Sequence, residues 1–166
     1  MAWQEEAAKH ARTINEFQTL RTEVASITTA TEGARGTLIK YLAQTAFAKD
    51  RFPVSESATT INFAWSDALK QQKPVTQYSW AFERASVLFN LAACSCALGV
   101  GTSRTDKAGI ETAARQFNCA AGIFERLRDA YASQVIGTLP YDLSPGGLSF
   151  CIQLMLAQAQ VRSVLD

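Results

Sequence analysis

The chain has 166 residues, of which 48% are hydrophobic and 19% are charged, proportions that fit one globular domain with a sizeable core. Its 16 Lys and Arg residues nearly balance its 15 Asp and Glu residues, so no global positive field would attract nucleic acid or an anionic membrane surface. The first residues carry no apolar run behind a basic start, so we expect no secretory signal peptide. One domain over residues 1–166, in a reducing compartment, is the expectation.

Two amphipathic helices are expected in the first third of the chain. Apolar residues recur at steps of three and four from Trp3 to Ile27, which is the stripe of one long helix. His10, the only histidine, falls on that stripe and is expected to be a partly buried packing residue, not a base or a ligand. A second helix is expected from Gly36 to Lys49. It should end before Phe52, because Pro53 disfavours helix in the residue before it.

The segment between Pro53 and Pro74 follows a different pattern. Ile61, Phe63 and Trp65 alternate with Asn and Ala, and this period of two predicts a short extended segment that packs through one face. A brief helix is expected to follow at Ser66–Gln71.

The most apolar segment of the chain is expected to be a helix that begins at Thr76 or Tyr78 and ends at Leu98. It contains no charged residue from Ala85 to Gly99, so it could be a membrane span, a helix enclosed by other helices, or the lining of a catalytic pocket. The uncharged run falls short of the roughly 20 residues that cross a bilayer, and we expect no transmembrane segment. An enclosed helix explains the composition better, with Gly99 as its left-handed cap.

Two more helices are expected in the last third of the chain. One follows Ser103 or Thr105 as its N-cap, with an apolar stripe from Ile110 to Tyr131 in which Gly122 would let a neighbour approach closely. The other begins at Ser144–Pro145 and runs to the last residue. The sequence thus predicts an all-α fold of five main helices in antiparallel succession. Five residues are expected in its core: Val87, Leu88, Leu91, Phe117 and Phe124.

Catalytic and metal-binding motifs do not emerge from the sequence. The four cysteines lie within apolar helical patterns at spacings that zinc sites do not use, which favours buried thiols over a disulfide or a metal site. No nucleophile elbow accompanies His10, and Gly99 and Gly101 follow a predicted helix, not the strand of a dinucleotide site. The acidic residues are scattered over predicted solvent faces, with Lys or Arg nearby. We therefore expect no enzyme, no cofactor and no metal.

Four segments resemble one known family in their order and spacing. They are "INFAWSDAL" at 61–69, "AFERASVLFNLAA" at 81–93, "AARQFNCAAGIFERLRD" at 113–129 and "DLSPGGLSFCIQLMLAQAQ" at 142–160. The chain resembles the BRO domain, the helical domain of the Alix, histidine-domain tyrosine phosphatase and rhophilin family. The resemblance covers residues 38–160 well and the first helix by position only. It implies a banana-shaped domain whose middle consists of antiparallel helix hairpins similar to tetratricopeptide repeats.

The resemblance also implies a function. It suggests a non-enzymatic, cytoplasmic, endosome-associated adaptor of the endosomal sorting pathway, because family members recruit ESCRT-III subunits. The C-terminal helix of the partner lies in a groove on the concave face of the domain. The alternative, from a different class, is a helical scaffold of a rhophilin-like signalling adaptor that does not bind ESCRT-III.

Two differences from the family bear on the candidate site. Where ESCRT-III-binding relatives place an aromatic anchor, this chain has Ser163, and where they place an acid and then a base four residues later, it has Lys107 and Glu111. These three residues are the candidate partner-binding residues. The lost anchor and the reversed charges imply weak binding of a generic ESCRT-III helix.

The chain also differs from the family in its length. The chain looks like a partial BRO domain, truncated at both ends relative to the family. Its last helix should therefore keep an incompletely covered apolar face, which favours self-association. The residues expected on that face are Phe150, Leu154, Met155, Val161, Val164 and Leu165.

Overall fold

The computed structural model describes residues 10–52, 54 and 61–160. Within these ranges the chain forms five α-helices and one small antiparallel sheet, which confirms the predicted all-α class. The helices are α2 (Ala11–Ala25), α3 (Glu32–Arg51), α4 (Trp80–Gly101), α5 (Lys107–Arg126) and α6 (Pro145–Gln160). The strands are β1 (Phe63–Trp65) and β2 (Val75–Gln77). Three short helical turns complete the described chain: η1 (Leu127–Tyr131), η2 (Ala132–Gln134) and η3 (Tyr141–Leu143).

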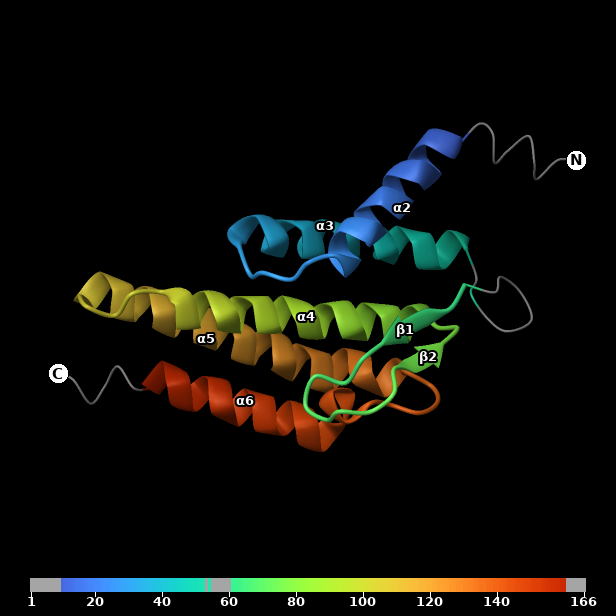
Figure 1. Ribbon diagram of the computed structural model, residues 1–166. Helices are drawn as coiled ribbons and strands as arrows, with labels where there is room; N and C mark the ends of the chain where they lie inside the picture. Colours follow the sequence, from blue (N-terminus) through green and yellow to red (C-terminus); the bar gives the residue numbers. More distant parts are fainter. Residues whose placement is uncertain (1–9, 53, 55–60, 161–166) are drawn as a thin grey trace, which may run out of the picture.

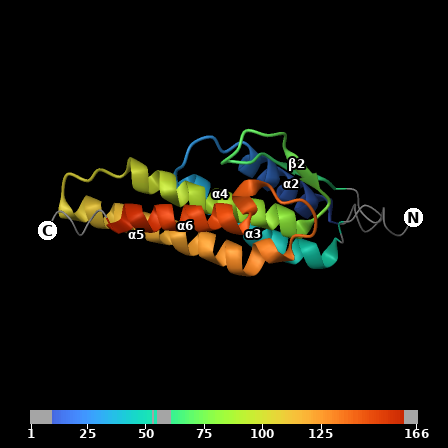
Figure 2. The same ribbon diagram turned by 90° about the horizontal axis from the view of Figure 1, so that it is seen from below.

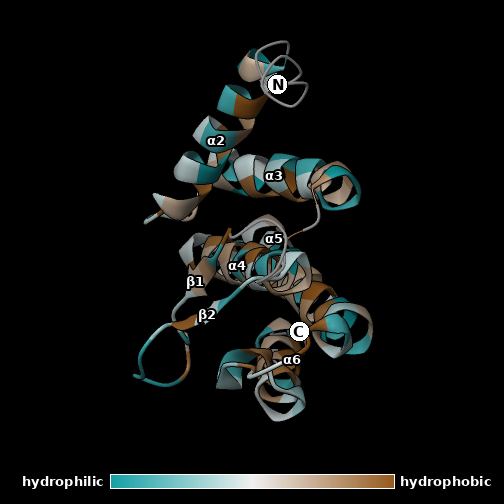
Figure 3. Cartoon of the chain, turned by 90° about the vertical axis from the view of Figure 1, so that its right-hand side faces the viewer, coloured by the Kyte–Doolittle hydropathy of each residue, from teal (hydrophilic) through white to brown (hydrophobic). Residues whose placement is uncertain are grey.

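The helices α3, α4, α5 and α6 form an antiparallel stack in which each helix packs on the next one in the sequence (Figure 1). Seen from below, α6 lies along α5 (Figure 2), and the end-on view shows α3, the α4–α5 pair and α6 as successive layers (Figure 3). α2 crosses α3 and buries only Leu20 and Val24. This arrangement confirms the predicted succession of antiparallel helix hairpins.

Four of the helices begin at a polar N-cap residue. The side chains of Thr31, Ser79, Asp106 and Ser144 each accept a hydrogen bond from the backbone N–H three residues later. Ser144 confirms the prediction for the last helix. The prediction of Ser103 or Thr105 for α5 was wrong, because the Asp106 carboxylate caps the helix at 2.7 Å from the N–H of Gly109.

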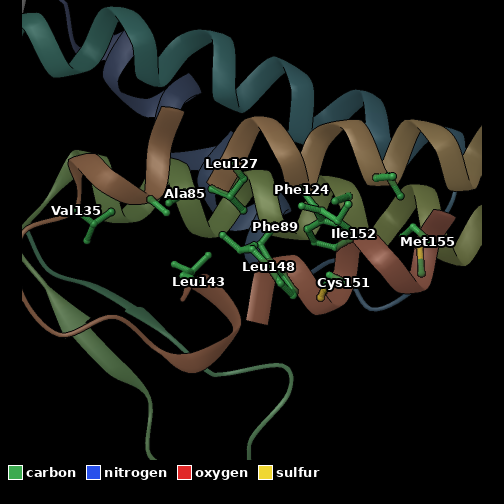
Figure 4. Close-up of a cluster of buried hydrophobic side chains, with 14 of the residues drawn as sticks. Ala85, Phe89, Phe124, Leu127, Val135, Leu143, Leu148, Cys151, Ile152 and Met155 are labelled. Atoms are coloured by element: carbon green, nitrogen blue, oxygen red, sulfur yellow. The ribbon is translucent and has the colours of Figure 1, made fainter. Parts of the chain in front are cut away.

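The apolar helix α4 lies between two hydrophobic clusters. Val87 and Leu91 pack with α2 and α3 in one cluster, while Phe89 packs with α5 and α6 in the other. The rings of Phe89 and Phe124 meet edge to face with centroids 5.2 Å apart, at the centre of the second cluster (Figure 4). Of the five predicted core residues, four are buried, and Leu88 is half-buried against both clusters.

α4 is long and apolar enough to cross a membrane by length and composition, and it is the single such helix among the described residues. Half of its most apolar window is buried inside the structure. α3 contacts α4 on one side and α5 contacts it on the other (Figure 1). This packing agrees with the interpretation of α4 as the enclosed core helix of the stack.

The helix predicted at Ser66–Gln71 does not form. These residues belong to the loop that joins β1 to β2, whose pairing places Phe63 opposite Gln77. One carboxylate oxygen of Asp67 accepts hydrogen bonds from the N–H groups of Leu69 and Lys70, each at 2.8 Å. Such local side-chain bonds offer the backbone an alternative to the helix, which explains the error.

Two predictions about glycine were also wrong. α4 continues through Gly99 to Gly101, so Gly99 is not a left-handed cap, and Gly137 is the one described glycine with a positive φ. A Cβ at Gly99 would lie 3.1 Å from the Phe117 ring, so the close approach predicted at Gly122 occurs at Gly99 instead. Gly122 faces open space.

The positions of His10 and of one cysteine differ from expectation as well. His10 immediately precedes α2 and is exposed. The buried residues of α2 lie only near its C-terminal end. Cys94 and Cys151 are buried and Cys96 is half-buried, whereas Cys119 is exposed.

Candidate protein-binding surface

The antiparallel packing of α5 and α6 brings the beginning of α5 and the end of α6 to the same end of the stack (Figure 1). Lys107 is the first residue of α5, and Glu111 follows one turn later on the same side of the helix. Ser163 lies outside the described residues, three positions after the last residue of α6, Gln160. The fold therefore places two of the three predicted site residues together, beside the end of α6.

The position of Lys107 follows from the local structure at the start of α5. Asp106 caps the helix, and a Cβ at Gly109 would overlap the backbone carbonyl of Ser103. Lys107 is exposed and Glu111 is half-buried. The helix dipole disfavours a cation in the first turn of a helix, so the position of Lys107 does not stabilise α5. Both charged side chains can contact a partner that approaches this end of the stack.

The two faces of α6 differ in burial. Its inner face points toward α5 and toward Phe89 and Phe124, as Figure 4 shows for the residues Leu148, Cys151, Ile152 and Met155, all of which are buried. On the outer side, Phe150 is 55% exposed and Leu154 is 42% exposed. Ala157, exposed one turn further on, completes what we call the α6 outer stripe: Phe150, Leu154 and Ala157.

The α6 outer stripe agrees in part with the expectation of an uncovered apolar face on the last helix. Phe150 and Leu154 are exposed as predicted, but Met155 is buried to 4% exposure against α5. The other predicted members, Val161, Val164 and Leu165, lie outside the described residues. None of the sixteen residues of α6 is charged, so this surface offers apolar contacts and neutral amides.

A buried carboxylate in α4 escaped the sequence analysis. Glu83 is 2% exposed, and its two oxygens accept hydrogen bonds from the Tyr41 hydroxyl and the Trp65 indole N–H, each at 2.7 Å. The Arg21 guanidinium lies 3.8 Å from the same carboxylate. Burial raises the pKa of Glu83, against the opposing effect of these two hydrogen bonds and of Arg21.

The Glu83 network has a structural role. It joins α2, α3, β1 and α4 at one point, and so it fixes the α2–α3 pair on the rest of the stack. The signal in the sequence was a single acid at the start of the most apolar helix, since a buried charge requires partners. Its partners come from residues 18 to 62 positions away, which local patterns do not reveal.

A pair of carboxylates holds the β1–β2 loop against η3, the turn that precedes α6. Asp67 accepts a hydrogen bond from the N–H of Tyr141 at 2.6 Å, and Asp142 accepts one from the N–H of Ala68 at 2.8 Å. Burial raises the pKa of Asp142. Among residues 10–52, 54 and 61–160, no group of three His, Cys, Asp or Glu side chains could hold a metal ion. The hydrogen bonds of Asp67 and Asp142 instead fix η3, and with it the beginning of α6, on the β1–β2 loop.

Comparisons with known proteins agree with this architecture. Residues 2–165 match the model of the BRO1-like domain family. ALG-2 interacting protein X of Dictyostelium discoideum is 35% identical over 93% of this chain and 19% of its own length. Vacuolar protein-sorting protein bro-1 of Neurospora crassa is 34% identical over 94% of the chain and 15% of its own length. Human Rhophilin-2 is 37% identical over 74% of the chain and 17% of its own length.

Solved structures extend the comparison. In a complex of ALIX BRO1 with CHMP4C, the similar chain is 27% identical, with a TM-score of 0.84 over 95% of this chain and 46% of that one. ALIX in complex with the SIVmac239 PYKEVTEDL late domain is 28% identical, with the same TM-score over 99% of this chain and 25% of that one. The chain thus spans less than half of the proteins that it matches. Sequence, fold and helix order agree, and the chain belongs to the BRO1-like domain family.

Proposed function

We propose that the chain is a non-enzymatic protein-binding adaptor module of the endosomal sorting pathway, and that it binds the C-terminal helix of an ESCRT-III subunit. The observation that carries this proposal is the exposed α6 outer stripe, which runs along α6 toward the end of the stack where α5 begins. Apolar anchors flanked by polar groups are typical of helix-in-groove recognition. The similar ALIX BRO1 structure contains CHMP4C, an ESCRT-III subunit, which supports the class of partner.

The proposal includes a cytoplasmic, endosome-associated location. The name of the Neurospora relative refers to vacuolar protein sorting, and this supports a role in the same process. The near balance of positive and negative charges favours recruitment by a protein partner over attraction to an anionic membrane surface.

Within this proposal, Lys107, Glu111 and Ser163 contact the bound helix. The charge order of the first two residues is reversed relative to ESCRT-III-binding relatives, and Ser163 replaces an aromatic anchor. An anchor of this kind commonly contributes about 2 kcal/mol, which corresponds to a loss of about thirtyfold in affinity. The unchanged chain should therefore bind a generic ESCRT-III helix weakly.

Calorimetric titration with a peptide that copies the C-terminal helix of CHMP4C tests the proposal. We expect weak binding by the unchanged chain and about thirtyfold tighter binding by a triple variant, Ser163→Phe with Lys107→Asp and Glu111→Lys. Circular dichroism of both proteins serves as the control for folding. Tight binding by the unchanged chain would show that these residues do not face the partner, and no binding by a folded triple variant would contradict the proposal.

The second candidate function is a rhophilin-like signalling scaffold that does not bind ESCRT-III. The similarity to human Rhophilin-2, at 37% identity, favours it specifically. The same titration separates the two functions, because a scaffold of this class would bind the CHMP4C peptide neither before nor after the three substitutions.

A further inference from the structure

The outer side of α3 is an exposed apolar surface on the opposite side of the stack from α6 (Figures 1 and 3). α3 packs on α4 and on α2, and the residues that point away from its buried side are exposed. Four of them form what we call the α3 outer face: Gly36, Ile39, Ala43 and Phe47. Phe47 is 72% exposed, the highest value for an aromatic side chain among the described residues, and Ile39 is 52% exposed. Neighbouring exposed apolar side chains of this kind mark an interaction surface.

α2 leaves the α3 outer face open. The two helices diverge, and an open groove of about 740 Å³ lies between them. Lys40 and Gln44 of α3 line one side of the groove, and residues of α2 that include Glu16 and Glu23 line the other. A helix that lies on the α3 outer face therefore meets apolar side chains at its centre and polar side chains along this edge.

The two halves of the α3 outer face differ in shape. Phe47 protrudes from the C-terminal half of α3, whereas Gly36 leaves a gap in the N-terminal half. A Cβ at Gly36 would meet no atom of the described residues within 4 Å, so this gap is open to a side chain from outside the chain. Glycine disfavours the interior of a helix, and no contact within the described residues requires it at position 36. The ring and the gap become complementary when α3 pairs with a second α3 that runs in the opposite direction.

The charges at the two ends of α3 favour the same direction of pairing. Glu32 lies in the first turn with its side chain 61% exposed, although it also contacts Arg35 at 2.7 Å, and Arg51 is the exposed last residue. Glu32 precedes Gly36 by four residues and Arg51 follows Phe47 by four residues. The register that places Phe47 on Gly36 of a second copy therefore also places Glu32 opposite Arg51. A parallel pair would bring like charges together, and such charges select an orientation while adding little affinity.

The size of the α3 outer face sets the strength of the pairing. A helix of 20 residues is about 30 Å long and about 10 Å wide, so one face covers on the order of 300 Å². A stable dimer uses about 800 Å² from each partner. A pair of α3 helices should therefore form a reversible dimer, with a dissociation constant between about 10 μM and 1 mM.

We infer that the α3 outer face binds the α3 outer face of a second copy, in an antiparallel pair that places each Phe47 ring on Gly36 of the other copy. The inference does not rest on the proposed function, because α3 and α6 lie on opposite sides of the stack. The α6 outer stripe remains free in such a dimer. Under the proposed function, the dimer would present two stripes and would bind an array of partner helices more tightly than a single chain does.

Sedimentation equilibrium of the full chain between about 10 μM and 1 mM tests the inference. We expect Phe47→Asp to raise the dissociation constant of the dimer at least about tenfold, because it removes the apolar contact. Gly36→Leu should raise it by a similar factor because it fills the gap, even though leucine favours the helix and should raise the melting temperature. The matched control is Phe150→Asp on α6, where the side chain is 55% exposed, and it should leave the dissociation constant unchanged. Circular dichroism checks the folding of each variant.

Cysteine cross-linking tests the direction of the pair. The variants also carry Cys119→Ser, because Cys119 is the exposed cysteine of the chain. In the antiparallel register, position 43 lies about 5 Å along the helix axis from its own copy, and position 50 lies about 25 Å from its own copy, at about 1.5 Å per residue. Ala43→Cys should therefore be cross-linked by a short bismaleimide, and Asp50→Cys should not.

Each part of the inference can be overturned by one of these measurements. A chain that stays monomeric at about 1 mM would show that α3 has no second copy as its partner. Equal weakening by Phe150→Asp and Phe47→Asp, or no weakening by Phe47→Asp, would place the dimer contact elsewhere. Cross-linking at both positions would show a parallel pair, and cross-linking at Asp50→Cys alone would show a different register.

Discussion

The helices α4 and α6 have similar apolar compositions but different surroundings. α4 packs against α3 on one side and α5 on the other, and eleven of its residues are buried. α6 packs mainly on α5 and leaves Phe150 and Leu154 exposed on its other side. The same kind of sequence therefore forms the core of the stack at one position and an uncovered face at another. Composition predicts that a helix is apolar, while its place in the stack decides what the apolar side chains do.

The two helices also differ in their treatment of charge. α4 buries Glu83 and satisfies it with Tyr41 and Trp65. α6 has no charged residue in its sixteen positions. A buried charge with defined partners fixes one arrangement of neighbouring elements, whereas a neutral apolar face accepts any partner of matching shape. The first property suits a scaffold and the second suits a binding surface.

The largest expected contrast between these helices is the loss of unfolding free energy when a phenylalanine is replaced by alanine. Phe89 in α4 is 6% exposed and meets Phe124 edge to face, so Phe89→Ala should lower the free energy of unfolding by about 3 to 5 kcal/mol. Phe150 in α6 is 55% exposed, so Phe150→Ala should change it by no more than about 0.5 kcal/mol. Urea melts of the two variants give both values. Similar losses would mean that the outer side of α6 is covered in solution.

The next largest effect concerns the buried charge of α4. Glu83→Gln places an amide NH₂ against a hydroxyl or indole donor, so one buried donor loses its acceptor. This should cost about 1 to 3 kcal/mol of unfolding free energy. Glu125→Gln on α5, an exposed acid outside this network, is the control and should cost less. Urea melts of both variants measure the difference, and equal costs would contradict the role assigned to the network.

Gly146 and Gly147 are adjacent at the beginning of α6 but have different surroundings. A Cβ at Gly147 would overlap the Tyr141 carbonyl, whereas a Cβ at Gly146 meets nothing within 4 Å. Gly147→Ala should cost about 1 to 3 kcal/mol by overpacking. Gly146→Ala should gain about 0.4 to 1 kcal/mol by restricting the unfolded chain. Thermal melts suffice to show the signs, and a loss at both positions would mean that Gly146 also faces a neighbour.

The smallest expected effect is the pH dependence of stability that the Glu83 carboxyl group of α4 contributes between acidic and neutral pH. Burial raises the pKa of Glu83 in the folded chain. The stabilisation linked to a raised carboxyl pKa is fully present below the unfolded pKa and is lost as pH rises through the folded value. The unfolding free energy of the unchanged chain, minus that of Glu83→Gln, should therefore grow as pH falls from neutral through the raised pKa. Urea melts at several pH values measure this difference; a difference that shrinks on acidification would contradict the direction of the shift.

Local signals in the sequence predicted much of the fold. Ser144 and Pro145 marked the beginning of α6, and the apolar stripes marked α4 and α5. Asp106 was missed as the cap of α5 because Ser103 and Thr105 have the same capping chemistry, and the choice depends on the close approach of Ser103 to Gly109. β2 was missed because its three residues acquire a strand identity only through pairing with β1.

The candidate surface was less predictable than the fold. The spacing of Lys107 and Glu111 placed them on one side of a helix, and antiparallel packing then placed them beside the end of α6. Phe150 and Met155 are both apolar residues of α6, and the position of α5 decides that the first is exposed and the second buried. The Glu83 network depends on three other elements, so no local pattern could reveal it.

The most direct test of whether α6 is the protein-binding surface of this BRO1-like module is a nuclear magnetic resonance titration. It measures the chemical-shift changes of the assigned backbone amides of the chain when a peptide binds. The CHMP4C helix peptide is titrated into the isotopically labelled chain. We expect shifts concentrated at Phe150, Leu154 and their neighbours in α6, with smaller shifts near Lys107 and Glu111 and none in α3 at Phe47. Shifts confined to α2 and α3, or no shifts at millimolar peptide, would contradict the assignment of α6 as the binding surface.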